Sequence, residues 1–404
     1  MKNRRSLPAV LGFLTVAGSL FFSLLTVEIA LRFLPVCSSL EKLPVDQHNP
    51  ILRFPSNQNF VYAKGWNFGI LNYGRVNNYG FVNNQDYQSN PEDLLLAVIG
   101  DSYVEALMVP YEQTLQGRLA ELYMGMGKIY SFGISGAQLA QYVAMGEYVW
   151  QEFHPQGLVF VIIGNDFDES LIRVRSGLHL FEKHSQNQSL NLVRTDYQPT
   201  VLEKVLKHSA IARYLWSTVG IGSLTRLPQS FARSEVAYVG NTSSDAAEER
   251  VRDSRLVVDA FFLELSRRIE LEPARIQFIV DGMRPQLYSP ENLANAQGSY
   301  FDLMRQYFIE TAIVKGYEVI DLQPGFIARH HKDGARFEFP TDGHWNGLGH
   351  QVAADAVSAS NLAKMVFTHS AGSRRSMNQS PLPYAQSSVS AGERLSAGVA
   401  PRQD

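Results

Sequence analysis

The stretch LLLAVIGDS, residues 94–102, decides the fold that we expect for this chain. Its six leading apolar residues are typical of a buried strand, and the amphipathic stretch over residues 112–124 predicts the helix that follows. The turn Gly100-Asp101-Ser102 therefore lies where a strand ends. Open α/β sheets bind their ligands at this carboxyl edge. Ser102 is thus a candidate nucleophile, provided that the chain also supplies a base and donors for an oxyanion.

The alternation of apolar and amphipathic segments continues from residue 94 onward. Strands are predicted over residues 94–99, 128–132, 158–163, 275–280 and 317–320. Helices are predicted over residues 112–124, 138–153, 255–269, 300–315 and 350–366. Apolar strands separated by helices indicate parallel βαβ units with both sheet faces covered. We therefore expect an α/β domain with a central parallel sheet of about five strands.

The composition and its shifts along the chain predict four regions. These are a transmembrane anchor (1–36), a juxtamembrane segment that packs on the main domain (37–93), the main domain (94–366) and a tail (367–404). Segment 37–93 is rich in Asn, Tyr, Phe and Gly, which favours short strands and turns. Within the main domain, residues 170–254 break the strand–helix rhythm and include a helical piece over 201–216. We interpret them as an insertion above the sheet, either part of a substrate cleft or a surface decoration. The tail has almost no large apolar residues and is predicted to be disordered.

The N-terminus has the pattern of a membrane anchor. Residues 6–27 carry no charge, and a helix of that length spans a hydrocarbon core of about 30 Å. Lys2, Arg4 and Arg5 precede it, so the positive-inside tendency places the bulk of the chain outside the cytoplasm. A cleaved signal peptide is the alternative, but the apolar run is long for one and no A-x-A-like site ends it. Cys37 weakly resembles a lipoprotein cleavage site, although a small apolar residue near the membrane is the simpler interpretation.

The bulk numbers exclude several classes of protein. The chain has 404 residues, a net charge of −3 and 45% hydrophobic residues, which suits one large or two small domains with a full core. Nucleic-acid binding usually demands a clustered basic face, which this balance does not provide. The single cysteine, Cys37, excludes an internal disulfide framework and a Cys-rich metal site. The chain also contains no P-loop, dinucleotide fingerprint or G-x-S-x-G elbow.

Four short blocks of sequence, which contain Ser102, Gly136, Asn165 and His344, supply the groups that a nucleophilic serine needs. Ser102 requires a base, and imidazole, which titrates near neutral pH, makes His344 the candidate. Asp342 lies two residues earlier, so in an extended loop its carboxylate points the same way and can orient the imidazole. Donors for the oxyanion are expected from the backbone N–H groups of Ser102 and Gly136 and from the side-chain amide of Asn165. Gly136 has no Cβ, so a substrate carbonyl can approach its backbone closely.

Each assignment has an alternative. Ser102 could instead be a helix N-cap, because Asp and Ser are favoured there, and Asn165 could be only a turn residue. His350 is a rival base, for which a surface or capping role is the better interpretation. The acidic residues Asp166, Asp168 and Glu169 could suggest a divalent metal, but we interpret them as a solvated loop. Asp101 and Asp166 are expected to accept backbone N–H groups rather than to take part in chemistry.

Taken in order, the blocks resemble those of the SGNH hydrolase family, also called GDSL esterases. Gly100-Asp101-Ser102 resembles the first block, Ser135-Gly136 the second, Gly164-Asn165-Asp166 the third, and Asp342 with His344 the last. The resemblance spans residues 94–366. It implies a three-layer, flavodoxin-like sandwich and acyl chemistry by a Ser-His-Asp triad, with no metal or other cofactor.

Two positions depart from the family pattern. Tyr103 stands where the name GDSL expects Leu, a change that we expect to be harmless. One residue separates Asp342 from His344, where many members have two. The resulting Asp-x-His-Trp block, which ends at Trp345, is similar to that of alginate acetyltransferase-like proteins, which move acetyl groups onto exported polysaccharide.

The sequence therefore predicts a single-pass membrane protein with an extracytoplasmic (periplasmic, in bacteria) serine esterase domain. The expected partners are an ester or acylated carbohydrate substrate and the membrane, and no nucleic acid. An O-acetyltransferase that works with polysaccharide assembly proteins is the first alternative, because hydrolysis and transfer share an acyl-serine intermediate. A non-catalytic binding protein of the same fold is the second.

Overall fold

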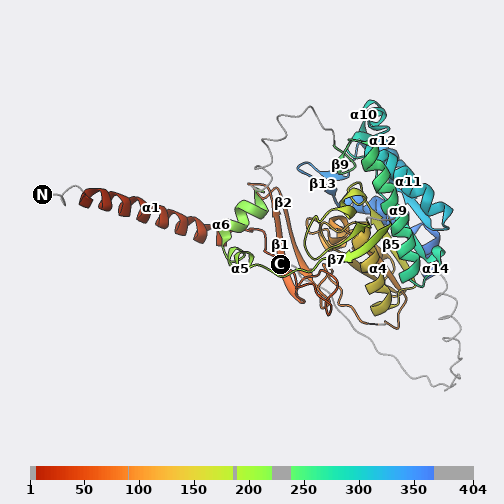
Figure 1. Cartoon of the computed structure of the whole chain (residues 1–404), viewed down its shortest axis with the longest axis horizontal. Helices are drawn as coiled ribbons and strands as arrows, with labels where there is room; N and C mark the ends of the chain where they lie inside the picture. The colour runs from red at the N-terminus through yellow and green to blue at the C-terminus, as the bar shows by residue number, and fades with distance from the viewer. Residues whose placement is uncertain (1–5, 90, 185–188, 221–237, 368–404) are drawn as a thin grey trace, which may run out of the picture.

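A parallel five-stranded sheet forms the centre of the protein, as predicted (Figure 1). The computed structural model describes residues 6–89, 91–184, 189–220 and 238–367. The strands of the sheet are β3 (Leu95–Gly100), β4 (Lys128–Gly133), β5 (Gly157–Ile162), β10 (Ile276–Val280) and β11 (Glu318–Asp321). Their order is β11-β10-β5-β3-β4, and every neighbouring pair is parallel. This is the doubly wound order of flavodoxin-like folds, in which the ligand crevice opens between the strands corresponding to β3 and β5.

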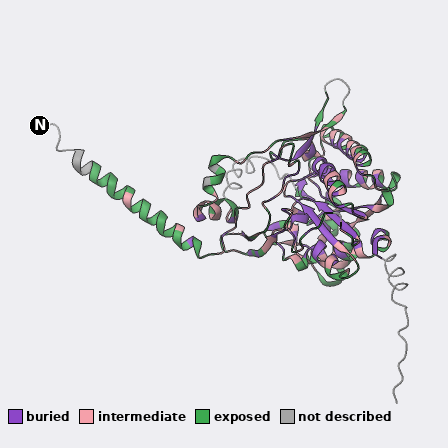
Figure 2. Ribbon diagram, turned by 90° about the horizontal axis from the view of Figure 1, so that it is seen from below, coloured by how far each residue is buried: buried purple, intermediate pink, exposed green. Residues whose placement is uncertain are grey.

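Helices cover both faces of the sheet, which explains why β3 and β5 are buried throughout (Figure 2). On β3, Leu95, Ala97 and Ile99 face one apolar cluster, and Leu96 and Val98 face the other. The first cluster includes α4 (Leu139–Phe153), α9 (Glu248–Arg268) and α11 (Tyr300–Val314). The second includes α3 (Leu115–Leu122), α12 (Leu322–Asp333), α13 (Gly347–Ser358) and α14 (Asn361–Phe367). The molecule is thus a three-layer α/β sandwich.

Several helix predictions need correction. The helix expected over 350–366 is two helices, α13 and α14, and α9 starts at Glu248, seven residues earlier than predicted. Among the helices that were not predicted are α10 (Pro290–Ala296) and α12. Pro324 and Gly325 of α12 look like turn residues in the sequence. Pro324 nevertheless lies in the first turn of the helix, where proline loses no hydrogen bond.

The N-terminal helix α1 (Ser6–Arg32) extends away from the rest of the molecule (Figure 1). Residues 10–32 have the length and composition of a membrane span, with a mean hydropathy of 2.1. A signal sequence has the same features. Near the end of α1, the Glu28 carboxylate accepts hydrogen bonds from the backbone N–H groups of Ala210 and Ile211 at the start of α6 (Ala210–Arg213). The helix therefore meets the body of the protein at α6.

Segment 37–93 lies against the main domain. It contains the antiparallel hairpin of β1 (Gln58–Lys64) and β2 (Ile70–Val76). Most of its buried apolar residues belong to the apolar cluster on the α4 side of the sheet, and Tyr87 stacks on Tyr130 of β4 at a ring-centroid distance of 4.0 Å. Segment and sheet thus share one core.

Residues 170–254 are spread over three places rather than forming one insertion above the sheet. The hairpin of β6 (His179–Lys183) and β7 (Leu190–Arg194) lies by α4 and α9, where Gln138 donates to the carbonyl of His179 at 2.7 Å. The helix expected over 201–216 is broken into α5 (Val201–Leu206), α6 and a π-helical turn (Tyr214–Thr218). The short hairpin of β8 (Tyr238–Val239) and β9 (Thr242–Ser243) reaches Asn165. Of the predicted tail, only Phe367 is described, at the end of α14; residues 368–404 lie outside the described residues.

Candidate active site

Ser102 is the first residue of a short helix, α2 (Ser102–Glu105), that directly follows β3. Asp101 is the N-cap: its carboxylate accepts the backbone N–H of Tyr103 at 2.9 Å. The loop-supporting role predicted for Asp101 is confirmed, and the alternative that Ser102 is the cap is wrong. Burial raises the pKa of Asp101 to about 6. The helix packs so closely on β4 that a Cβ on Gly133 would lie 2.2 Å from the backbone nitrogen of Glu105, so only glycine fits there.

His344 and Asp342 lie on β13 (Asp342–Trp345), which pairs with β12 (Glu338–Phe339). The extended backbone turns both side chains to one side, as the two-residue spacing predicts. Nε2 of His344 is 2.7 Å from Oγ of Ser102, and Nδ1 of His344 is hydrogen-bonded to Oδ1 of Asp342. Residues 242 positions apart in the sequence thus form one hydrogen-bonded chain from serine to imidazole to carboxylate.

Lys64, at the end of β1, is the fourth member of this chain and was not predicted. Its Nζ lies 2.5 Å from Oδ2 of Asp342, whose side chain is only 2% exposed. Burial alone would raise the pKa of Asp342, but hydrogen bonds from His344 and Lys64 hold it below its usual range. Nothing in the sequence signals the pair, because 278 residues separate the two side chains. The β1–β2 hairpin of segment 37–93 therefore contributes a side chain to the candidate site.

A second network fixes the strand that carries His344. The backbone carbonyl of Gly343 accepts hydrogen bonds from the hydroxyl of Tyr103 at 3.0 Å and from the guanidinium of Arg284 at 3.2 Å. Arg284 is buried and forms an ion pair with Asp281 at 2.6 Å. Asp281 also accepts from the indole of Trp345. Tyr103 thus joins the serine turn to the strand that carries His344 through a hydrogen bond. That the change from Leu to Tyr is harmless stays a prediction.

The position of Asp281 in the sequence indicates that it lies near the candidate site. It directly follows β10, as Asp101 directly follows β3. A polar residue immediately after a predicted buried strand lies at the same edge of the sheet.

Gly136 and Asn165 follow β4 and β5, the two strands that flank β3. Gly136 has a φ of +82°, a conformation that side-chain-bearing residues rarely adopt. Within the described part of the chain its N–H has no hydrogen-bond acceptor, as an oxyanion donor requires. One N–H of the Asn165 amide is donated to Glu169 at 2.8 Å, and its oxygen accepts from Asn241. No hydrogen bond among the described residues joins Gly136 or Asn165 to Ser102 or His344, so their role as oxyanion donors stays a prediction.

The rival base His350 is not on the surface. It is 1% exposed, and its Nδ1 accepts the backbone N–H of Leu115 at the start of α3. Burial lowers the pKa of His350 to about 3, so the ring is a neutral acceptor. The surface location that we expected is therefore wrong, whereas a hydrogen bond to a helix start is present.

The acidic cluster after β5 is also not a solvated loop. Asp166 is fully buried, and it accepts hydrogen bonds from the hydroxyl of Tyr142 and the backbone N–H of Ile163, the latter as predicted. Asp168 forms an ion pair with Arg250 at 2.8 Å. Across the described residues, no group of three or more His, Cys, Asp or Glu side chains is arranged to hold a metal ion.

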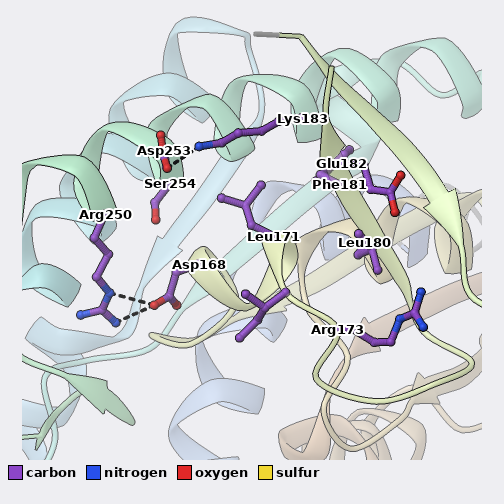
Figure 3. A pocket seen from close by; sticks show the side chains of 11 residues that line it. Asp168, Leu171, Arg173, Leu180, Phe181, Glu182, Lys183, Arg250, Asp253 and Ser254 are labelled. Carbon is purple, nitrogen blue, oxygen red and sulfur yellow. Dashed lines mark hydrogen bonds and ion pairs between the residues drawn. The ribbon is translucent and has the colours of Figure 1, made fainter. Parts of the chain in front are cut away.

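A cavity of about 700 Å³ lies away from Ser102, between β6, α9 and the 3₁₀ turn Asp168–Leu171 (Figure 3). Two ion pairs, Arg250 with Asp168 and Lys183 with Asp253, occupy its wall. Apolar side chains, Leu171 and Leu180 among them, also line the cavity. None of the residues proposed for the chemistry lines this cavity.

Comparison with protein-family models and with curated protein sequences finds no match. Several solved structures are similar. A two-domain esterase active on acetylated mannans, co-crystallised with mannopentaose, shares 13% identity over 68% of this chain and 50% of that chain, with a TM-score of 0.34. A lipolytic protein of the G-D-S-L family from Veillonella parvula DSM 2008 shares 11% identity over 68% of this chain and 98% of that chain, with a TM-score of 0.34.

An acetyl xylan esterase shares 14% identity over 65% of this chain and 98% of the esterase chain, also with a TM-score of 0.34. The chain spans about half the length of the two-domain mannan esterase. At these identities and TM-scores the similarities carry no information on substrate or activity.

Proposed function

We propose that this protein is an SGNH-type serine esterase that cleaves an O-acyl ester through Ser102, His344 and Asp342. The observation that carries the proposal is the hydrogen-bonded chain of these three side chains, with Ser102 Oγ 2.7 Å from His344 Nε2. Nucleophilic catalysis requires such a hydrogen bond between the nucleophile and its base, with a third group that orients the base. A non-catalytic protein of the same fold has no need to hold its serine within hydrogen-bond distance of a histidine.

The proposed reaction begins with attack of the Ser102 hydroxyl oxygen on the ester carbonyl. Nε2 of His344 takes the hydroxyl proton, and Asp342 stabilises the resulting imidazolium. The N–H groups of Ser102 and Gly136 and the amide of Asn165 stabilise the oxyanion. Collapse breaks the bond to the leaving alkoxide, which receives the proton from His344. Water then attacks the acyl-serine by the same steps, which releases the acid and restores Ser102.

We further propose that α1 anchors the protein in a membrane, with the esterase domain on the extracytoplasmic side. The length of the apolar helix and the cations before it support this orientation. The Asp-x-His-Trp spacing at Asp342 favours a carbohydrate ester as substrate. The same spacing favours O-acetyl transfer to an exported polysaccharide, together with assembly proteins, as the second candidate function.

Hydrolysis of p-nitrophenyl acetate by the purified full chain in detergent tests the proposal. We expect nitrophenolate release well above a blank of detergent alone, and acetate release from acetylated oligosaccharides. Faster acetyl transfer to an added oligosaccharide than release of free acetate would favour the transferase. If neither product forms with any ester in the panel, the proposed function is wrong.

Replacing Lys64 by methionine is expected to lower kcat/KM about tenfold, because a charge-assisted hydrogen bond of ~1.5–3 kcal/mol to Asp342 is lost. The kcat/KM is measured for Lys64→Met, for Lys64→Arg, which keeps the charge, and for Lys332→Met, which replaces an exposed lysine on α12. We expect Lys64→Arg to retain more activity than Lys64→Met. A kcat/KM of Lys64→Met equal to that of Lys332→Met would contradict the assignment.

A further inference from the structure

A second cavity, of about 310 Å³, opens beside the loop that carries Gly136. Two of its wall residues connect it to the candidate active site. Glu105 ends the four-residue helix that starts at Ser102, and Ser135 directly precedes Gly136. At a rise of about 1.5 Å per residue, Glu105 is only about 5 Å along the helix axis from Ser102. The cavity wall thus includes residues three positions from Ser102 and one position from Gly136.

The cavity contains a buried cation without a partner. The Nζ atom of Lys42 is buried, and it has no hydrogen-bond acceptor in the part of the chain that the structure describes. The Nζ atom lies 6.0 Å from the centroid of the Phe54 ring. Burial and the charge of Arg175 lower the pKa of Lys42 to about 8, and Glu105 opposes this shift. A desolvated ammonium is costly to leave unpaired, so its position calls for an acceptor that enters from the cavity.

A carboxylate oxygen on the cavity wall also lacks a hydrogen-bond partner among the described residues. Glu105 is 2% exposed, and one of its carboxylate oxygens accepts from the hydroxyl of Ser135. Its other oxygen, Oε1, has no partner among the described residues. Arg175 lines the cavity too and donates to the carbonyl of Ser135 at 3.1 Å. The wall thus carries two cations and one carboxylate, with one donor and one acceptor free for a ligand.

We propose that this cavity binds an anionic group, a carboxylate or a phosphate, of the molecule whose ester reacts at Ser102, with Lys42 as its main cation. The free oxygen of Glu105 accepts from a hydroxyl of the same molecule. Tyr62, Phe54 and Phe60 supply flat apolar surface around these polar groups, as a sugar ring requires. The inference rests on the proposed function for the identity of the bound molecule as substrate. Water alone is the competing occupant.

Calorimetry on the full-length Ser102→Ala protein in detergent tests the inference without turnover. The probes are glucuronate, glucose 6-phosphate and glucose, which separate a carboxylate and a phosphate from a neutral sugar. We expect at least one acidic sugar to bind about tenfold or more tighter than glucose at pH 7. Adding Lys42→Met removes the difference, Lys42→Arg retains it, and Lys332→Met leaves it unchanged. The Lys42→Arg protein also controls for folding.

Binding of the acidic sugar is further expected to weaken between pH 7 and about pH 9.5, because Lys42 loses its proton in that window. The other titratable groups on the wall besides Glu105 and Arg175 are Cys37 and Tyr62, whose pKa values burial raises. Equal affinity for glucose and both acidic sugars, or full binding after Lys42→Met, overturns the inference. Because the assay needs no catalysis, an inactive enzyme that binds acidic sugars contradicts only the proposed function. An active one without that preference contradicts only this inference.

Discussion

Replacing Ser102 by alanine lowers kcat for p-nitrophenyl acetate by roughly 10⁴–10⁶-fold, because the group that forms the acyl intermediate is gone. Substrate binding and the oxyanion donors remain, so KM changes little and any residual rate comes from water in the same site. The fold is expected to persist, because Asp101 and not Ser102 caps α2. Initial rates over a range of substrate concentration give both constants.

The matched control for this substitution is Ser266→Ala. Ser266 is an exposed serine of α9 whose hydroxyl donates to the carbonyl of Leu263 in its own helix. The Ser266→Ala protein should retain the wild-type kcat. Near-wild-type activity of Ser102→Ala, with a melting temperature equal to that of the control, would show that Ser102 is not the nucleophile.

Replacing His344 by glutamine lowers kcat/KM by about 10²–10⁴-fold, the usual contribution of a general base. Glutamine can still hydrogen-bond to Ser102, but it cannot take and return a proton. Lowered activity therefore reflects lost proton transfer rather than a lost contact. The rival base His350 does not fit this role, because its Nδ1 accepts the N–H of Leu115 and burial lowers its pKa to about 3, which makes it a weak base.

The control for the His344 substitution is His331→Gln. His331 is an exposed histidine of α12. Kinetics at several pH values separate the two. The His344→Gln protein should lose the rise in kcat/KM that follows deprotonation of the base, whereas His331→Gln should keep it. Loss of the rise in both, or in neither, would contradict the assignment.

The sheet was predictable because its signals are local. Strands β3, β5 and β10 are short runs buried along their whole length, and the blocks at Ser102, Gly136 and Asn165 directly follow β3, β4 and β5. The pairing of Asp342 with His344 was predictable from the period of two in extended backbone. Helix α12 was missed because Pro324 and Gly325 mask a helix whose stability comes from packing Phe326 into the core.

The supporting contacts of the site could not be predicted, because they join residues far apart in the sequence. Lys64 reaches Asp342 only because the β1–β2 hairpin folds onto the carboxyl edge of the sheet. Arg284 and Tyr103 meet at the carbonyl of Gly343 for the same reason. No property of a lysine in a hairpin or of a tyrosine after a serine indicates its tertiary partner. Segment 37–93, which contains Lys64, is thereby in direct contact with the proposed triad.

Covalent labelling tests most directly whether Ser102 is an activated nucleophile. The full-length protein is treated with a fluorophosphonate, which reacts with serines that a neighbouring base activates, and is then digested and analysed by mass spectrometry. We expect one adduct, on the peptide that contains Ser102, and its loss in both Ser102→Ala and His344→Gln. Absence of an adduct on Ser102, or labelling of Ser102 that persists unchanged in His344→Gln, would contradict this role of Ser102.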